Sequence, residues 1–373
     1  MKLAVPIHSF EPGGVERVAL NLCAAWQADG VEVTVVLGRD EGAMKGTSPP
    51  LNYQIMPEPV PTASFETLWM IRVLRRYLSR TPTDVVWASG NTYAIVAVAM
   101  KLLLGRRCPP IAIKLSNDLY RKDMIAPYRA AYHWWLRVQG RMLDHFIGMA
   151  QPMRAEIAGL MRVPDEKITI IEDPSLAEDQ FAALSALPRA PAPRPPAPRA
   201  PHYIAVGRLA GQKNFALLLR AFARLDDPAA RLTILGEGAE RPRLERLARG
   251  LGLAGRLSLP GHVADPLPYL AEASAFVLSS DYEGVPAVVI EALAAGLPLV
   301  ATRCSVSIPG LLRDGAFGRL VEVGDEAGLA EAMRDVLTMP FDPAAARAAA
   351  APFRISQAAG RYRKLFAKLA IRE

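Results

Sequence analysis

Short apolar runs alternate with amphipathic stretches along almost the whole chain, and this alternation is the feature that most constrains the fold. Continuous apolar runs of a few residues are typical of strands buried on both faces. Strands that alternate with helices form parallel sheets covered on both faces. We expect strands at Leu3–Ile7, Val31–Leu37, Asp84–Trp87, Ile111–Leu115, Phe146–Met149, Ile168–Ile171, Tyr203–Val206, Leu232–Leu235, Leu257–Leu259, Ala275–Leu278 and Leu299–Ala301.

A proline-rich segment divides this pattern into two halves. Residues 188–201 read PRAPAPRPPAPRAP and contain seven Pro, four Ala and three Arg, with nothing that could build a core. Such a composition favours an extended, solvated spacer. The fold class is therefore α/β, with two Rossmann-like domains at 1–187 and 202–355 that face each other across a cleft. Open parallel sheets bind ligands beyond the carboxyl ends of their strands, so the cleft is the expected site.

Composition excludes several classes of protein. The 373 residues are 51% hydrophobic and 22% charged, as in a globular protein and unlike a disordered one. The best apolar run, Tyr93–Leu104, is too short for a membrane span and carries Lys101. The N-terminus reads as a first strand and not as a signal peptide, which predicts a cytoplasmic protein. Three scattered cysteines and the absence of zinc-type spacing predict neither disulfides nor a metal site.

The net charge of +7 lies mostly in the residues from 188 onward. Stacking aromatic residues do not interleave the basic residues there, so the charge favours an anionic small molecule over nucleic acid as the partner.

A glycine pair follows the first predicted strand. Gly13 and Gly14 open the next helix, where glycines let backbone amides approach a ligand at the positive end of the helix dipole. A plain tight turn is the alternative.

The segment VGRLAGQKN at 206–214 is a stronger candidate for a phosphate site. Asn214 is the expected N-cap of a helix that starts at Phe215, which places Arg208 and Lys213 at the N-terminus of that helix. Cations are unfavourable there unless an anion lies between them. The two side chains suit a diphosphate, which they could neutralise as a leaving group. Two solvated surface cations are the alternative.

Gly236 and Gly238 flank a glutamate after another predicted strand. This turn suits either a nucleotide edge lying on the backbone or an ordinary strand-to-helix connection.

The sequence SSDYEGVPAVVIEAL at 279–293 carries the most chemistry. Pro286 fits the first helical position, so Glu283 lies in the loop and Glu291 more than a turn inside an otherwise apolar helix. A buried carboxylate needs hydrogen-bond donors, which a ribose diol would supply. Gly284 and Val285 would bring backbone amides to a phosphate. An internal amide or arginine partner for Glu291 is the alternative.

These segments together resemble the retaining glycosyltransferases of family 4, which have the GT-B fold. The resemblance rests on GGVER at 13–17, GRLAGQKN at 207–214, LGEG at 235–238 and EGVPAVVIE at 283–291. It implies transfer of a sugar from a nucleotide-diphospho-sugar, with retention at the anomeric carbon and without a metal or other cofactor. Residues 356–373 resemble the helix that such proteins send back onto the N-terminal domain.

The resemblance also implies roles for single residues. Arg208 and Lys213 would hold the donor diphosphate, Glu283 would contact the donor sugar near the reacting carbon, and Glu291 would bind the ribose. The family often has a histidine after the strand near residue 115, where this chain reads KLSND at 114–118. Asp118 in this loop is a candidate acceptor-side base or sugar ligand, and a helix cap is the alternative. Residues 306–310 replace a glycine-rich turn of the family, so the donor contacts of that turn are either lost or replaced by contacts of Ser305 and Ser307.

Two arginine-rich stretches bear on the acceptor. Trp69–Arg80 and Tyr128–Arg141 combine arginines with aromatic and aliphatic residues, as helices on anionic lipid surfaces do, or as structural helices with basic edges. We expect a glycan or lipid-linked acceptor, in cell-surface polysaccharide or lipopolysaccharide synthesis, at the inner face of the membrane. A sugar-nucleotide epimerase of the same fold and a non-catalytic nucleotide-sugar binding partner remain as alternatives.

Overall fold

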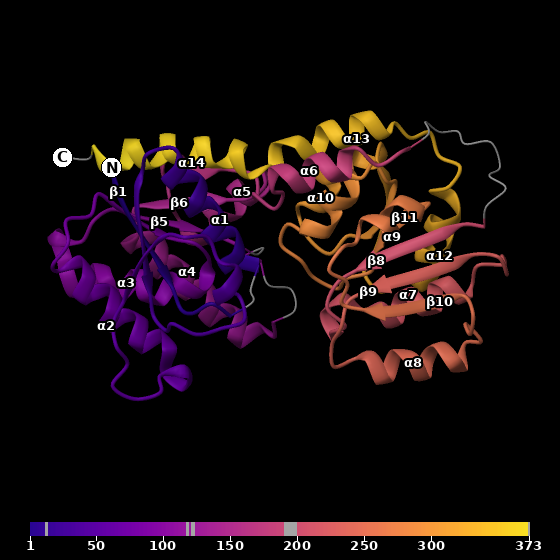
Figure 1. The fold of residues 1–373 in the computed structure, drawn as a ribbon, viewed down its shortest axis with the longest axis horizontal. Helices are drawn as coiled ribbons and strands as arrows, with labels where there is room; N and C mark the ends of the chain where they lie inside the picture. The colour runs from indigo at the N-terminus through magenta and orange to yellow at the C-terminus, as the bar shows by residue number, and fades with distance from the viewer. Residues whose placement is uncertain (12–13, 117–118, 121–123, 190–199, 372–373) are drawn as a thin grey trace. The chain divides into compact units, whose positions relative to one another are not determined.

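The structure, a computed structural model, describes residues 1–11, 14–116, 119–120, 124–189 and 200–371. The chain divides into two compact units (Figure 1). The first consists of Met1–Pro174 together with Ile355–Glu373, and the second of Ser175–Arg354. The sequence predicts instead a domain boundary at the proline-rich segment 188–201, most of which lies outside the described residues. The structure changes unit earlier, after Pro174, because the helix that follows packs with the second unit.

The first unit contains a seven-stranded sheet in the order β3-β2-β1-β4-β5-β6-β7, and all its described pairings are parallel. Its central strands are almost wholly buried, as the continuous apolar runs predict. The strands are β1 (Lys2–Ile7), β2 (Glu32–Leu37), β3 (Asn52–Ile55), β4 (Val85–Ala88), β5 (Ile111–Lys114), β6 (His145–Gly148) and β7 (Ile168–Ile170).

Helices connect these strands. They are α1 (Gly14–Ala28), α2 (Glu66–Leu78), α3 (Ala94–Leu104), α4 (Ala126–Met142) and α5 (Met153–Met161), to which the C-terminal helix α14 (Ile355–Ala370) is added. The spacing of Leu68, Ile71, Leu74 and Leu78 predicts that they share one face of α2, and this is wrong for Leu68. The buried face is made by Trp69, Met70, Val73 and Leu74, and Leu68 is 67% exposed.

An aromatic cluster fixes α14 to the first unit, along which it runs in yellow in Figure 1. Trp26 of α1 packs edge-to-face against Trp87 of β4 and against Tyr362 and Phe366 of α14, with ring centroids 5.0, 5.6 and 5.2 Å apart. All four rings are fully buried. Edge-to-face aromatic pairs of this kind add about 0.5–1.5 kcal/mol each beyond their burial.

The second unit contains a six-stranded sheet in the order β10-β9-β8-β11-β12-β13, again with parallel pairings. The strands are β8 (His202–Val206), β9 (Arg231–Leu235), β10 (Leu257–Gly261), β11 (Ala275–Leu278), β12 (Leu299–Thr302) and β13 (Gly318–Val321). The helices are α6 (Glu178–Ser185), α7 (Phe215–Ala223), α8 (Arg241–Gly250), α9 (Leu267–Glu272), α10 (Ala287–Ala294), α11 (Ile308–Leu311), α12 (Glu326–Asp335) and α13 (Pro343–Ala350).

Each sheet has one point at which the strand order reverses. In the second unit the chain moves outward from β8 through β9 to β10, and then returns to the other side of β8 with β11. The loops after β8 and β11 therefore leave the sheet in opposite directions, and such a position at the carboxyl ends of two strands is where open parallel sheets bind ligands. The loop at 207–214 and the loop at 279–286 follow these two strands.

Candidate functional site

The loops after β8 and β11 are held together by hydrogen bonds of both backbone and side chains. The Asp281 amide donates to Gln212 O at 2.9 Å, and Asn214 Nδ2 donates to Asp281 Oδ1 at 2.7 Å. The Ser279 hydroxyl donates to Lys213 O at 2.9 Å. Asn214 also caps α7, because its side chain accepts a hydrogen bond from the Leu217 amide, as the sequence predicts.

An ion pair between these loops lies at the centre of the site. Lys213 Nζ is 2.6 Å from Glu283 Oε1, and the two side chains are only 20% and 10% exposed. The buried Ser280 hydroxyl donates to the same oxygen at 2.7 Å. Among the described residues no hydrogen bond reaches Glu283 Oε2. Two donors thus fix the orientation of the carboxylate and leave one oxygen for another group.

Gly207 makes room for the lysine. A Cβ at this position would lie 3.3 Å from Lys213 Cε, so the lysine side chain passes directly over the glycine. Arg208, the next residue, is exposed and has no ion pair within the described part of the chain. The site therefore holds one cation tied to a carboxylate and a second cation open to solvent, both in the loop after β8.

The Gly236–Gly238 turn packs against the segment that carries Arg208. A Cβ on Gly236 would lie 2.0 Å from Gly207 O, and one on Gly238 would lie 2.3 Å from Leu209 O. Gly236 also has φ +139°, which favours glycine. Close backbone packing accounts for both glycines, and a nucleotide contact at this turn stays a prediction.

Glu283 lies in the loop as predicted, but the helix that follows begins one residue later than expected. Pro286 is the N-cap of α10, with extended backbone (ψ 109°), and not its first helical residue. No side chain caps this end of the helix within the described residues. Val285 packs partly against the core. The first amides of α10 are thus without a side-chain partner, and Gly284 precedes them.

Ser305 and Ser307 support the loop through internal hydrogen bonds, and a donor contact of either residue stays a prediction. Both are buried, their hydroxyl oxygens lie 2.7 Å apart, and Ser307 Oγ donates to Gly284 O at 2.8 Å. Glu283 is held from the same side, because its amide donates to Cys304 O at 3.0 Å. Burial raises the pKa of the Cys304 thiol to about 12, so this thiol stays protonated at neutral pH.

Glu291 lies on α10 and is half-buried. Gln180 Nε2 of α6 donates to Glu291 Oε1 at 3.1 Å. An amide partner of this kind is the alternative that the sequence leaves open. The sequence predicts that residues 178–185 belong to the N-terminal domain, so it does not identify Gln180 as a neighbour of Glu291.

Only some of the candidate site residues of the first unit lie in the described part of the chain. Gly14 begins α1, and a Cβ there would meet nothing within 4 Å. Gly13 and Asp118 lie outside the described residues. At the end of β5 the buried side chain of Lys114 pairs with Asp173, so the strand that precedes Asp118 ends in an internal ion pair.

The described residues contain no group of three or more His, Cys, Asp or Glu side chains placed to hold a metal ion. None of the helices in this part of the chain is both long and apolar enough to cross a bilayer.

Comparisons with known proteins cover both units. The sequence model described as Glycosyltransferase Family 4 matches residues 12–174, and the one described as Glycosyl transferases group 1 matches residues 200–339. The lipopolysaccharide core biosynthesis glycosyltransferase LpsE of Rhizobium meliloti (strain 1021) is 39% identical over 137 residues. This match covers 37% of the chain and only 39% of LpsE.

Longer matches have lower identity. An α-1,4-N-acetyl-D-galactosaminyltransferase of Campylobacter jejuni is 23% identical over 348 residues, which are 90% of this chain and 89% of that protein. Among solved structures, the lipopolysaccharide outer core galactosyltransferase WaaB, in its apo form, has a TM-score of 0.76 at 17% identity and covers 99% of this chain and 100% of its own. HepE of Anabaena, in complex with UDP, has a TM-score of 0.72 at 17% identity, with 99% and 100% covered.

The family models account for most of both units, and the solved neighbours have the same pair of parallel-sheet domains. The chain therefore belongs to glycosyltransferase family 4, the glycosyl transferases of group 1, and has the GT-B fold.

Proposed function

We propose that this chain is a retaining, metal-independent hexosyltransferase that moves a sugar from a nucleotide-diphospho-sugar to a glycan or lipid-linked acceptor. The pathway is the synthesis of lipopolysaccharide or another cell-surface polysaccharide. The observation that carries the proposal is the Lys213–Glu283 pair at the strand-order reversal of the second unit, next to the exposed Arg208.

The charges at this place fit a leaving diphosphate. Lys213 and Arg208 follow β8, and a diphosphate between them would be neutralised in the absence of a metal. The uncapped amides at the start of α10 would donate to the same group, since a helix N-terminus favours anions. As the bond to the sugar breaks, negative charge grows on the diphosphate, so these groups bind the transition state more strongly than the ground state.

The two glutamates have different environments. Glu283 is oriented through Oε1 by Lys213 and Ser280, which leaves Oε2 to accept a hydrogen bond from a hydroxyl of the donor sugar. Glu291 would bind the two ribose hydroxyls, with Gln180 orienting its carboxylate. Gly14, at the start of α1, leaves open space for a donor or acceptor group at the first unit. Gly13 and Asp118 keep the roles that the sequence suggests for them.

The named relatives and neighbours support the choice of substrates. HepE was solved with UDP and with UDP-glucose. An N-acetylgalactosaminyltransferase of Campylobacter jejuni, 37% identical over 134 residues, is named for a diphospho-undecaprenol-linked acceptor. LpsE and WaaB are named for lipopolysaccharide synthesis. A lipid-linked or lipopolysaccharide acceptor at the cytoplasmic face of the membrane follows by analogy for this chain.

Three neighbouring helices of the first unit support an encounter with an anionic membrane surface. Helix α2 packs against α3, and α3 packs against α4. Their exposed apolar side chains include Leu68, Leu102, Tyr128 and Trp134, all more than 60% exposed. Arginines accompany them, a combination that binds anionic lipid surfaces. Co-sedimentation with anionic but not with neutral liposomes at low salt is the expected result, and no binding to either would contradict this part of the proposal.

A donor screen tests the proposed reaction. The full chain is incubated with common nucleotide-sugars and with lipid or glycan extracts, and the released nucleoside diphosphate is measured. Release that requires an acceptor and is lost in Glu283→Ala supports the transferase. Conversion of the donor sugar without an acceptor would instead indicate an epimerase. Failure of every nucleotide to raise the unfolding temperature would indicate a chain that does not bind donors, since a ligand that binds only the folded state must stabilise it.

A further inference from the structure

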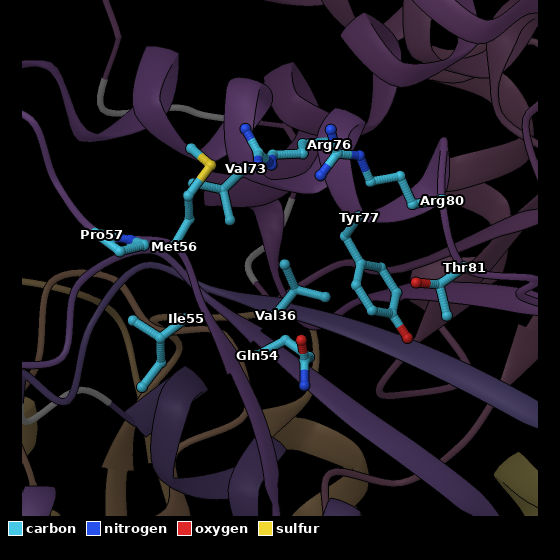
Figure 2. Close-up of a pocket in the computed structure, with 10 residues that line it drawn as sticks. All are labelled: Val36, Gln54, Ile55, Met56, Pro57, Val73, Arg76, Tyr77, Arg80 and Thr81. Atoms are coloured by element: carbon cyan, nitrogen blue, oxygen red, sulfur yellow. The ribbon is translucent and has the colours of Figure 1, made fainter.

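A cavity of about 230 Å³ lies at the edge of the first sheet, away in sequence from the residues of the proposed donor site and beside the arginine-rich stretch Trp69–Arg80. It is bounded by the edge strand β3 and the segment after it on one side, and by the last turns of α2 on the other (Figure 2). Its volume corresponds to several water molecules of ~30 Å³ each, which is room for a small organic group and not only for an ion.

The cavity floor is apolar. Val36 and Val73 are 0% and 4% exposed, and Ile55 and Met56 line the side next to β3. Ile55 itself is 45% exposed. An apolar body in the cavity would remove this side chain from water.

The rim next to α2 is cationic. Arg76 and Arg80 lie one turn apart, and both line the cavity, together with Tyr77 and Thr81 (Figure 2). Neither arginine has an acidic partner in the described part of the chain, whereas many of the other described arginines do. Like charges one turn apart repel each other, and an anion between them would reverse this effect.

The position at a helix C-terminus explains part of this pattern, since cations are favourable there. It does not explain why these two arginines border a cavity with an apolar floor and with the hydroxyl side chains of Tyr77 and Thr81 at its wall. Two guanidinium groups match the charge of about −1.5 to −2 on a phosphate monoester better than that of a single carboxylate.

We propose that this cavity binds a phosphate monoester carried on a small apolar or glycerol-like body. The phosphate lies between Arg76 and Arg80, and the ester body lies against Val36, Val73 and Ile55. The site is separate from the donor site of the second unit and does not depend on the proposed reaction. The same chemistry exists in a lipid head group and in a free phosphorylated metabolite, and the experiment distinguishes the two.

The test measures binding to the full chain by calorimetry with three probes, which are glycerol 3-phosphate, dihexanoyl phosphatidic acid below its micellar concentration, and inorganic phosphate. We expect saturable binding of at least one ester, at least about tenfold tighter than that of inorganic phosphate. Tighter binding of the lipid identifies a membrane source, and equal or tighter binding of glycerol 3-phosphate identifies a free metabolite.

Matched variants locate the site. Arg76→Gln/Arg80→Gln should weaken binding of the ester by at least about tenfold, and Arg72→Gln/Arg75→Gln should leave it within about twofold. The control pair removes the same charge from α2, close to Arg76 and Arg80, but does not line the cavity. Gln54→Trp, which fills the cavity from the exposed edge strand at constant charge, should also abolish binding. Equal losses in the two arginine pairs, normal binding in Gln54→Trp, or no saturable binding of either ester would overturn the proposal.

Discussion

Lys213 Nζ lies 2.6 Å from Glu283 Oε1, and this contact joins the loop after β8 to the loop after β11. The two residues are 70 positions apart in the chain. They meet because the strand order places β8 beside β11, so that the loops at their carboxyl ends share one edge of the sheet. The geometry of the proposed donor site is thus a consequence of sheet topology.

Ser280 provides the first test of this geometry. Its hydroxyl helps to orient Glu283, so Ser280→Ala should lose a hydrogen bond worth about 0.5–1.5 kcal/mol and lower kcat several-fold. In a Glu283→Ala background the same serine change should have almost no further effect on kcat, because its acceptor is gone. Steady-state rates for the four proteins of this double-mutant cycle measure the coupling. Additive losses would show that Ser280 does not act through Glu283.

The close backbone packing of the turn at Gly236 and Gly238 should make the stability of the protein sensitive to substitution there. Gly238→Ala would place a Cβ 2.3 Å from Leu209 O, a backbone atom that has no flexible way to retreat. Urea unfolding should therefore show a loss of several kcal/mol, comparable to severe overpacking. Gly250→Ala is the matched control, because a Cβ there meets nothing within 4 Å at the end of α8. It should be neutral or stabilise the protein by up to about 1 kcal/mol.

If Glu291 binds the ribose, replacing it should remove the preference of the protein for ribose over 2′-deoxyribose. For the wild-type protein, the 2′-deoxy form of the nucleoside diphosphate should bind about tenfold more weakly than the ribose form, since a hydrogen bond to a charged group contributes about 1.5–3 kcal/mol. For Glu291→Ala the two forms should bind equally. Calorimetry on this pair of ligands distinguishes a ribose contact from the structural role implied by Gln180. A variant that still discriminated between the two ligands would remove Glu291 from the donor site.

His202 should make the free energy of unfolding depend on pH. Burial lowers the pKa of this side chain below its ordinary value of 6.5, and its Nε2 lies 2.9 Å from Thr233 Oγ1. Below pH 6.5 the unfolded chain binds a proton that the folded chain does not, so the free energy of unfolding falls as the pH falls from 6.5 toward the lower folded pKa. Denaturant unfolding between pH 5 and pH 8 measures this effect. The free energy of unfolding of His202→Gln should fall less with decreasing pH than that of the wild-type protein. If the free energy of unfolding depended on pH equally in the two proteins, His202 would have the same pKa in the folded and unfolded states.

The strands that the sequence predicts are those with continuous apolar runs, and the two that it misses lie at sheet edges. In β3 the residues Asn52 and Gln54 alternate with Tyr53 and Ile55, and most of the strand is exposed. In β13 the run is broken by Arg319. An edge strand has a neighbour on one side only, so it needs less apolar surface and leaves a weaker signal.

The sequence identifies single residues of the candidate site, but it does not identify all the contacts that these residues make. Asn214, Lys213 and Glu283 could be placed because each follows a strand or caps a helix. The partner of Glu291 could not, because Gln180 lies before the proline-rich segment and its helix returns to the second unit only through packing with α10. The start of α10 was placed one residue early, because proline fits both the N-cap and the first helical position.

The central claim is that Lys213 and Arg208 hold a diphosphate, and ligand affinity tests it most directly. The tightest binder among UDP, GDP and ADP is titrated into the wild-type chain, Lys213→Ala and Arg208→Ala, alongside the corresponding nucleoside without phosphates. Each variant should raise the Kd of the diphosphate at least about tenfold and leave the Kd of the nucleoside unchanged. Diphosphate affinities equal to that of the wild-type chain in both variants would contradict the account.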